Sequence, residues 1–287
     1  MLWALLISVS TSFAQATLDD FSFYRFSSIP ALHHSPLSQP WVGGLNTVRF
    51  FEIDLDFDGT NDLLAFDKHG NRILPFLNRD NVFIHAPEIA RQFPPLHDWM
   101  LLCDYNHDGR PDIFTYGLAG ITVYENISEN HQLAFRLKCE QLNAYYYNGY
   151  VNIFAAPTDY PIIEDIDSDG HLDILNFWVL GKFVHHLRNA SDDPNVFDFQ
   201  LVDECWGHFS ESADDNGITL FTDCNSKTYN DGTQLRHTGS TMLLHDFDGN
   251  GLPDLLLGDM DFPNLILLYN NGTRGTLLES ARTTSQG

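Results

Sequence analysis

Residues 54–67 read DLDFDGTNDLLAFD, and this stretch decides the fold. Four aspartates, Asp54, Asp56, Asp58 and Asp62, fall within nine residues and are followed directly by an apolar run. Carboxylates this close together repel one another and oppose compact folding. The stretch therefore needs a partner that offsets its charge.

Three further segments align with this stretch. DYNHDGRPDIF begins at Asp104, DIDSDGHLDIL at Asp165 and DFDGNGLPDLL at Asp246, so the four starts lie 50, 61 and 81 residues apart. Every copy has Asp at position 1, Asp or Asn at positions 3 and 5, Gly at position 6, Asp at position 9 and then two apolar residues. A pattern this long found four times indicates an internal repeat.

The flanks of the four acidic segments repeat as well. The apolar runs VRFFEI, WMLLC, YPIIE and TMLLH precede them, and two further apolar runs separated by a turn follow each one. Short runs rich in aromatic and branched residues, bounded by Gly, Asn and Asp, are typical of strands. One unit is then strand, acidic loop, strand, tight turn, strand and a fourth strand, which predicts an all-β protein, a β-propeller of four-stranded antiparallel blades. The four visible blades are expected near residues 47–85, 98–140, 160–204 and 240–280, with an insertion at 190–240.

The acidic loops have the chemistry of a calcium site. Carboxylates at alternate positions of a tight loop can converge on one point, and the shared glycine allows the bend that a Cβ would hinder. Oxygen ligands in this number favour Ca²⁺, which accepts six to eight of them in irregular geometry. The alternative is an acidic turn held by Asx hydrogen bonds without a metal.

An EF-hand opens with the same spacing, but it needs a bidentate Glu at position 12 and flanking helices. Position 12 holds Ala65, Thr115, Asn176 and Leu257 in the four copies, and the flanks have strand character. The EF-hand is therefore excluded.

The motif D-x-[DN]-x-[DN]-G-x-x-D followed by apolar residues resembles the FG-GAP/VCBS repeat family, which includes the integrin α-subunit propellers. The resemblance covers residues 41 to about 275 and extends, more loosely, to large secreted bacterial propellers. It implies that the side chains at positions 1, 3, 5 and 9 and the carbonyl at position 7 bind up to four Ca²⁺ ions. The implied ligands are Asp54, Asp56, Asp58, Thr60 and Asp62; Asp104, Asn106, Asp108, Arg110 and Asp112; Asp165, Asp167, Asp169, His171 and Asp173; and Asp246, Asp248, Asn250, Leu252 and Asp254. The second and fourth sites, with one Asn each, are expected to be weaker.

Composition narrows the possible partners. The formal charge is −24, from 39 acidic and 15 basic residues, so a nucleic acid would be repelled and cations are favoured. Residues 1–16, MLWALLISVSTSFAQA, are typical of a secretory signal peptide, although no Lys or Arg precedes the apolar run. The alternative for this segment is an N-terminal strand or membrane anchor. We expect a secreted or cell-surface protein with no later membrane span.

Export makes disulfides possible. Four cysteines allow three pairings, and proximity in sequence favours Cys103–Cys139 and Cys205–Cys224. None of the four has the spacing of a zinc site.

The resemblance implies a ring of seven blades, so we expect a truncated ring that continues beyond Gly287. The alternative is a small closed ring whose last outer strand comes from residues 21–27, FSFYRFS. The expected function is binding or adhesion to an extracellular protein or glycan, without chemistry of its own, because no motif of a known catalytic class is present. The alternative is a carbohydrate-active enzyme of the polysaccharide lyase kind. The aromatic run Tyr145–Tyr150 is a candidate sugar platform, with blade packing as its alternative.

Overall fold

The computed structural model describes residues 32–33, 35–36, 42–179, 181–212, 217–221, 240–272 and 280–283. The chain divides into two units, residues 1–44 and 45–287. In the described part of the first unit, β1 (Leu32–His33) pairs antiparallel with β2 (Ser35–Pro36). The predicted signal peptide and the candidate strand at residues 21–27 lie outside the described residues.

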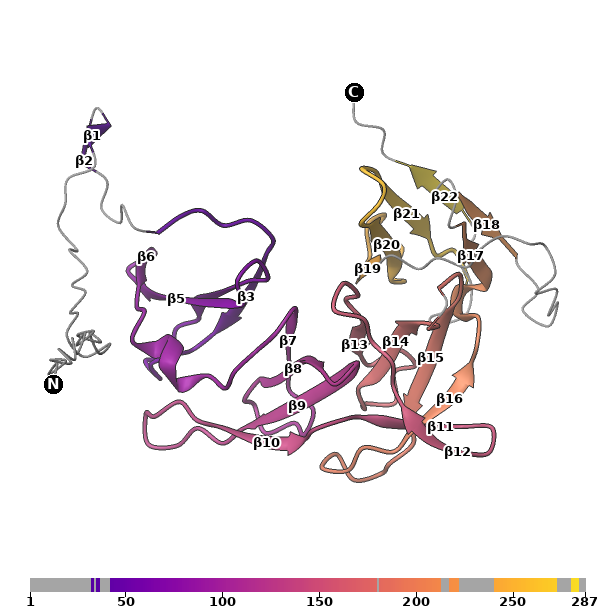
Figure 1. Ribbon diagram of the computed structural model, residues 1–287, viewed down its shortest axis with the longest axis horizontal. Coiled ribbons are helices and arrows are strands. Elements are labelled where there is room, and N and C mark those ends of the chain that lie inside the picture. Colours follow the sequence, from indigo (N-terminus) through magenta and orange to yellow (C-terminus); the bar gives the residue numbers. More distant parts are fainter. Residues whose placement is uncertain are drawn as a thin grey trace, which may run out of the picture. The chain divides into compact units, whose positions relative to one another are not determined.

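The described residues of the second unit contain four blades, each with four antiparallel strands that pair in chain order (Figure 1). The first sheet holds β3 (Val48–Ile53), β4 (Asp62–Asp67), β5 (Arg72–Arg79) and β6 (Val82–His85), and the second holds β7 (Met100–Cys103), β8 (Asp112–Gly117), β9 (Gly120–Asn126) and β10 (Phe135–Cys139). The third holds β13 (Ile162–Glu164), β14 (Asp173–Phe177), β15 (Val184–Asn189) and β16 (Phe199–Asp203), and the fourth holds β19 (Ser240–His245), β20 (Asp254–Asp259), β21 (Leu265–Tyr269) and β22 (Ser280–Thr283). The predicted all-β propeller of four-stranded antiparallel blades is confirmed.

The hydrophobic cores lie between neighbouring blades. Ile113 on β8 packs into the core shared with the first blade, whereas Phe114, the next residue, packs into the core shared with the third. Ile174 and Leu175 on β14 divide in the same way between the second and fourth blades. Successive side chains of a strand point to opposite faces, so a strand covered on both faces reads as a continuous apolar run. Full burial of a side chain as large as Phe114 contributes about 2–3 kcal/mol.

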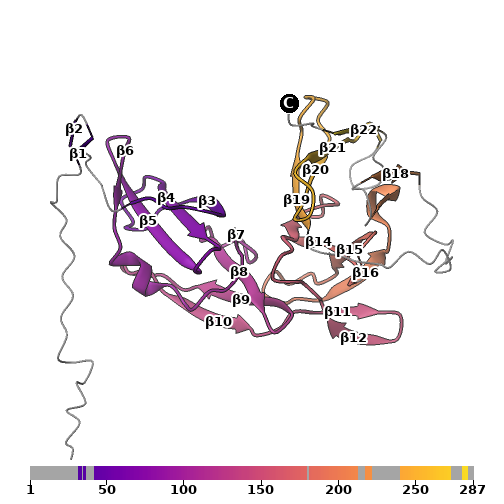
Figure 2. The same cartoon turned by 45° about the horizontal axis from the view of Figure 1, so that its top comes forward.

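The first strand of every blade faces the interior side of the unit, as Figures 1 and 2 show for β3, β7, β13 and β19. β13 lies beside both β7 and β19. The acidic loop follows each of these first strands directly, so the four loops share one end of the blades. In line with this, His107 Nε2 in the second loop lies 2.8 Å from the Gly170 carbonyl oxygen in the third.

The third sheet departs from the four-strand plan. A hairpin of β11 (Asn143–Tyr146) and β12 (Gly149–Asn152) extends it, because β11 pairs in parallel with β16. The pairing covers the outer edge of β16, which would otherwise present unpaired backbone groups. In the insertion, η3 (Trp206–His208) leads into the paired strands β17 (Phe209–Glu211) and β18 (Ile218–Leu220). A second short helix, η2 (Ile89–Gln92), connects the first two blades.

The predicted Cys103–Cys139 disulfide is wrong, because both residues are free thiols. Cys103 ends β7 and Cys139 ends β10, and the sheet order β10-β9-β8-β7 puts these strands at opposite edges. Three strand spacings amount to about 14 Å, twice the Cα separation that a disulfide can bridge. Cys205 is buried, and Cys224 lies outside the described residues, so the second pairing stays a prediction.

Candidate metal centres

The four acidic loops have the same backbone path. The glycine at position 6 has a positive φ in every copy, between 83° and 91°, as the sequence predicts. Position 4 is left-handed as well, with φ of 63° at Phe57, 59° at His107, 68° at Ser168 and 78° at Gly249. Sequence reasoning missed position 4 because its residue type changes from copy to copy. Two left-handed residues so close together turn the chain sharply, and in the first loop ligand oxygens of positions 1, 3 and 5 lie within 4.8 Å of one another.

The aspartate at position 1 accepts hydrogen bonds from the backbone of positions 5 and 6. In the first loop, Asp58 N lies 3.2 Å and Gly59 N 2.9 Å from the two oxygens of Asp54. The same two bonds recur at Asp104, Asp165 and Asp246. Position 5 in turn accepts from the backbone N–H of position 7, at 2.7–2.9 Å. The loops are thus held in a shape that keeps their carboxylates together.

The aspartate at position 9 ties its loop to a strand farther along the chain. This residue is fully buried in every blade. In chain order the four residues are Asp62, Asp112, Asp173 and Asp254. In the fourth blade, Asp254 accepts from Phe247 N at 2.9 Å and from Asn270 N at 2.8 Å. The first two blades repeat both bonds. In the third, the Asn189 N–H donates to one oxygen of Asp173, and His186 Nε2 lies 3.0 Å from the other.

The asparagine that ends the third strand of each blade completes this connection. Asn126 donates its backbone N–H to Asp112 and its Nδ2–H to the Pro111 carbonyl, and its Oδ1 accepts from Ser128 N at 3.1 Å. Asn270 repeats the arrangement on Asp254 and Pro253. These asparagines shape turns, which explains why they recur.

The carboxylates converge in three of the loops. Among the described residues, ligand atoms lie within 4.8 Å of one another at Asp54, Asp56 and Asp58; at Asp165, Asp167 and Asp173; and at Asp246, Asp248 and Asp254. The described residues contain no such carboxylate trio in the second loop, whose position 3 is Asn106. Asp62, also an implied ligand, is outside the first trio.

Arginines approach three of the loops. Arg79 pairs with Asp56 and Asp58, Arg188 with Asp167 at 2.8 Å and with Asp169 at 2.7 Å, and Arg110 with Asp108 at 2.5 Å. Each guanidinium is more than 40% exposed. Because exposed ion pairs contribute at most about 1 kcal/mol, the arginines offset only part of the local repulsion.

The donor sets fit the calcium that the family resemblance implies. Asp56 Oδ1 is buried without a hydrogen-bond partner, which is the state expected of an oxygen that accepts a cation. The oxygens that accept one backbone N–H keep a second lone pair for an ion. Burial raises the pKa of Asp112 to about 7, although the hydrogen bonds from the Asn126 and Tyr105 N–H groups act in the opposite direction. A bound dication would favour the charged form.

Comparisons with known proteins add a likeness of structure. No family model matches the chain, and no curated protein matches it in sequence. A solved structure of an Agrocybe aegerita lectin, described for its specific recognition of non-reducing terminal N-acetylglucosamine, aligns with a TM-score of 0.42 and 17% identity. The alignment covers 82% of this chain and 66% of the lectin, so the chain spans just under two-thirds of that protein. Over the described residues, no helix has the length and apolarity to cross a membrane.

Proposed function

We propose that this chain is an exported, calcium-binding β-propeller of the FG-GAP/VCBS repeat type that binds protein or glycan ligands outside the cell. The observation that carries the proposal is the repeated hydrogen-bond network of the four acidic loops. The same positions make the same bonds in every blade, and three loops bring three carboxylates within 4.8 Å. Repetition of a strained, highly charged loop is hard to explain without a cation at its centre.

The role of the ion in this proposal is structural. Each loop joins the first strand of a blade to the second, and the buried aspartate at position 9 extends the connection to the third strand. A dication at the loop would therefore hold three strands of one blade in register. Affinities of about 10⁻⁴ to 10⁻³ M, usual for extracellular modules, would be sufficient.

A glycan ligand is supported by the β11–β12 hairpin. Tyr145, Tyr147 and Tyr150 are 42%, 65% and 60% exposed, and Tyr145 packs edge-to-face on Tyr150 with ring centroids 5.4 Å apart. The Tyr150 hydroxyl donates to Asp198 Oδ1 at 2.6 Å, which fixes the ring on its strand. Exposed, immobilised aromatic rings with a polar group beside them suit the apolar face and hydroxyls of a sugar.

The calcium part of the proposal is tested by thermal unfolding of the full chain. Four sites at ten times their dissociation constant would raise Tm by about 10 °C or more over the value in EDTA. Magnesium at the same concentration serves as the control and should raise Tm much less. An unchanged Tm between EDTA and millimolar calcium would remove the metal from the proposal.

The ligand part is tested on a glycan array with the calcium-loaded protein. Tyr147→Ala should abolish binding, whereas Val82→Ala, a similarly exposed apolar position in the first blade, should leave it intact. Analysis of the captured glycan for cleavage products tests the alternative of a polysaccharide lyase. Binding that survives Tyr147→Ala would contradict the proposed platform.

A further inference from the structure

A row of four side chains crosses the outer part of the third sheet, on β15, β16, β11 and β12 (Figure 1). Arg188 on β15 pairs with Gln200 on β16, and Gln200 in turn pairs with Tyr145 on β11. Tyr145 pairs with Tyr150 on β12. Paired residues of adjacent strands lie on the same face of a sheet. Phe199, which precedes Gln200, is fully buried in the core shared with the second blade, so the row lies on the opposite face.

The aromatic end of the row is fixed before any ligand binds. One oxygen of Asp198 accepts from the Tyr150 hydroxyl, and the other accepts from Gln200 Nε2 at 3.3 Å. Tyr145 lies between these two residues and packs on Tyr150. A site whose side chains are already ordered binds its ligand at a lower entropic cost. The two rings offer a surface for stacking, and the amide offers a hydrogen-bonding group.

Arg188, at the other end of the row, is held by the third acidic loop. Its Nε lies 2.8 Å from Asp167 Oδ2, and its Nη2 lies 2.7 Å from Asp169 Oδ2. Both aspartates are implied calcium ligands, and Asp167 is one of the converging carboxylates. The arginine side chain is 43% exposed, so these ion pairs contribute at most about 1 kcal/mol each. A dication competes for the same two carboxylates and repels the guanidinium, and it would therefore release Arg188 from the loop.

A released Arg188 can turn along the row. At the backbone it lies one strand spacing, about 4.8 Å, from Gln200 and two spacings, about 10 Å, from Tyr145. A sugar ring stacked on Tyr145 would have the Gln200 amide beside its hydroxyls, and a charged substituent directed towards β15 would reach the guanidinium. The planar fork of an arginine matches a carboxylate with two parallel hydrogen bonds.

Charge explains why an acidic ligand and the ion belong together. The formal charge of −24 repels an acidic ligand, so its carboxylate needs a cation at the site. Without calcium, Arg188 is neutralised by Asp167 and Asp169. We propose that the row binds an acidic sugar, a uronic acid, and that calcium at the third loop promotes this binding by releasing Arg188 to the carboxylate of the sugar. The proposal rests on the glycan platform proposed above and adds the class of its ligand and its dependence on calcium.

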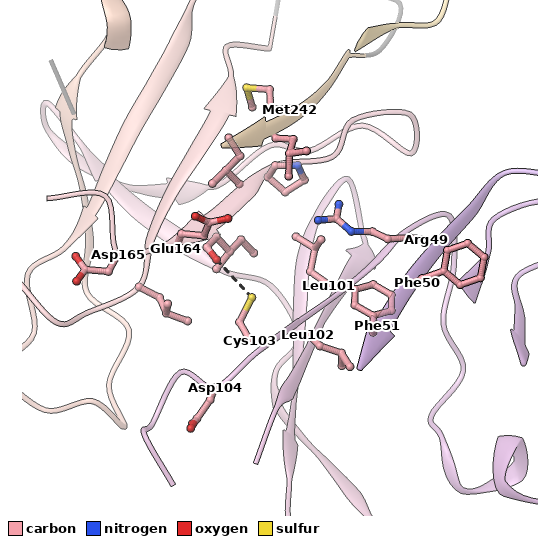
Figure 3. Close-up of a pocket in the computed structure, with 15 residues that line it drawn as sticks. Arg49, Phe50, Phe51, Leu101, Leu102, Cys103, Asp104, Glu164, Asp165 and Met242 are labelled. Atoms are coloured by element: carbon pink, nitrogen blue, oxygen red, sulfur yellow. Dashed lines mark hydrogen bonds between the residues drawn. The ribbon is translucent and has the colours of Figure 1, made fainter. Parts of the chain in front are cut away.

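A cavity at the inner edges of the blades does not suit the same ligand (Figure 3). It has a volume of about 420 Å³, and its walls come from β3, β7, β13 and β19. Figure 3 shows one guanidinium in its lining, that of Arg49, and three carboxylates, those of Asp104, Glu164 and Asp165. The rest of the described lining is largely apolar. Three anions to one cation make the cavity unfavourable for an acid, so a uronic acid is expected to bind at the outer row.

Isothermal titration of the full chain with two matched sugars tests the ligand class and the role of calcium. Methyl β-D-glucuronide and methyl β-D-glucoside differ only in the carboxylate that replaces a hydroxymethyl group. In calcium, the glucuronide should bind at least about tenfold more tightly than the glucoside, as expected for a hydrogen-bonded charge pair. In EDTA, at a temperature at which the chain remains folded, that preference should be lost. Because linkage is reciprocal, saturating glucuronide should also raise the affinity of the chain for calcium.

Arg188→Met, compared with the wild type in calcium, separates the release of the arginine from other effects of the ion. This variant should bind the glucuronide about tenfold more weakly than the wild type does, while its affinity for calcium does not fall. Arg136→Met removes an exposed arginine that pairs with Glu125 on the second blade, and it should change the affinity for neither sugar. The comparison needs no metal-free protein, so it stays decisive where EDTA unfolds the chain.

The outcomes distinguish this inference from the glycan platform itself. If neither sugar binds at roughly 10 mM in calcium, the inference fails, and the glycan array decides separately whether the platform does. If the two sugars bind equally tightly, or if folded Arg188→Met binds the glucuronide like the wild type, the inference alone is overturned. Equal affinity for the glucuronide in calcium and in EDTA would refute the release of Arg188.

Discussion

Replacement of Asp254 by alanine should destabilise the fourth blade severely, and it should do so whether or not calcium is present. The Asp254 side chain is fully buried, and its two oxygens accept the backbone N–H groups of Phe247 and Asn270. Alanine leaves both donors without their acceptor. A hydrogen bond to a charged group contributes about 1.5–3 kcal/mol, so the two bonds together correspond to about 3–6 kcal/mol of unfolding free energy.

The assay is equilibrium unfolding in urea, with EDTA in both samples so that metal binding contributes nothing. The matched control is Asp248→Asn in the same loop. Asp248 is exposed, and asparagine keeps an oxygen that can accept from Asn250 N. The control should therefore change the unfolding free energy in EDTA by less than about 0.5 kcal/mol. In calcium it should lose part of the ion's stabilisation, because one ligand charge is missing.

The two variants distinguish a structural carboxylate from a ligand carboxylate. If Asp254→Ala unfolded at the same urea concentration as the wild type in EDTA, the buried hydrogen bonds would not carry the stability assigned to them. If Asp254→Ala were less stable than the wild type in calcium but equally stable in EDTA, position 9 would act as a metal ligand alone.

Three other outcomes follow from the same structure. Gly251→Ala forces a side chain into φ of +84° and should cost about 1–2 kcal/mol, whereas Gly149→Ala, with open space at its Cβ and an ordinary φ, should be nearly neutral in the same urea assay. Burial lowers the pKa of His185 from 6.5 to about 4. Between these pH values the unfolded chain binds more protons than the folded chain, so the free energy of unfolding should fall by about 3 kcal/mol as pH drops from 6.5 to 4. The unfolding free energy of the His185→Gln variant should fall less over the same pH range. Arg79→Met removes the cation that pairs with Asp56 and Asp58, so calorimetry should show calcium affinity at the first loop rising by up to about fivefold; an unchanged affinity would mean that the arginine and the ion do not compete.

The sequence predicted the blades well because its signals were local and repeated. The acidic loop, its glycine and the flanking apolar runs occur within about twenty residues of one another, and four copies corroborate each other. The packing of Ile113 and Phe114 on β8 into two different cores agrees with the alternation of side chains along a strand. Position 9 was recognised as part of the motif, but its hydrogen bonds to a strand fourteen to sixteen residues later were not.

The failures involve contacts between segments that are distant in the sheet. Proximity in sequence suggested a Cys103–Cys139 bond, but the meander of a blade carries its first and fourth strands to opposite edges. The run Tyr145–Tyr150 was read as a candidate sugar platform, and the hairpin β11–β12 was not predicted, because nothing local reveals that β11 will pair in parallel with β16. The cavity lined by β3, β7, β13 and β19 was not predicted for the same reason, since lining residues such as Phe51 and Ile163 are more than a hundred residues apart in the sequence.

The arginines change the order of calcium affinity that ligand charge alone predicts for the four loops. By that count the second and fourth loops, with Asn106 and Asn250, are the weaker sites. The structure adds a competing cation to the first three loops, whereas the described residues supply no ion pair to the fourth. Without calcium, repulsion among Asp246, Asp248 and Asp254 is therefore offset by hydrogen bonds alone. The loop with the smaller ligand charge then has the most to gain from an ion, because no guanidinium must be displaced before the ion binds.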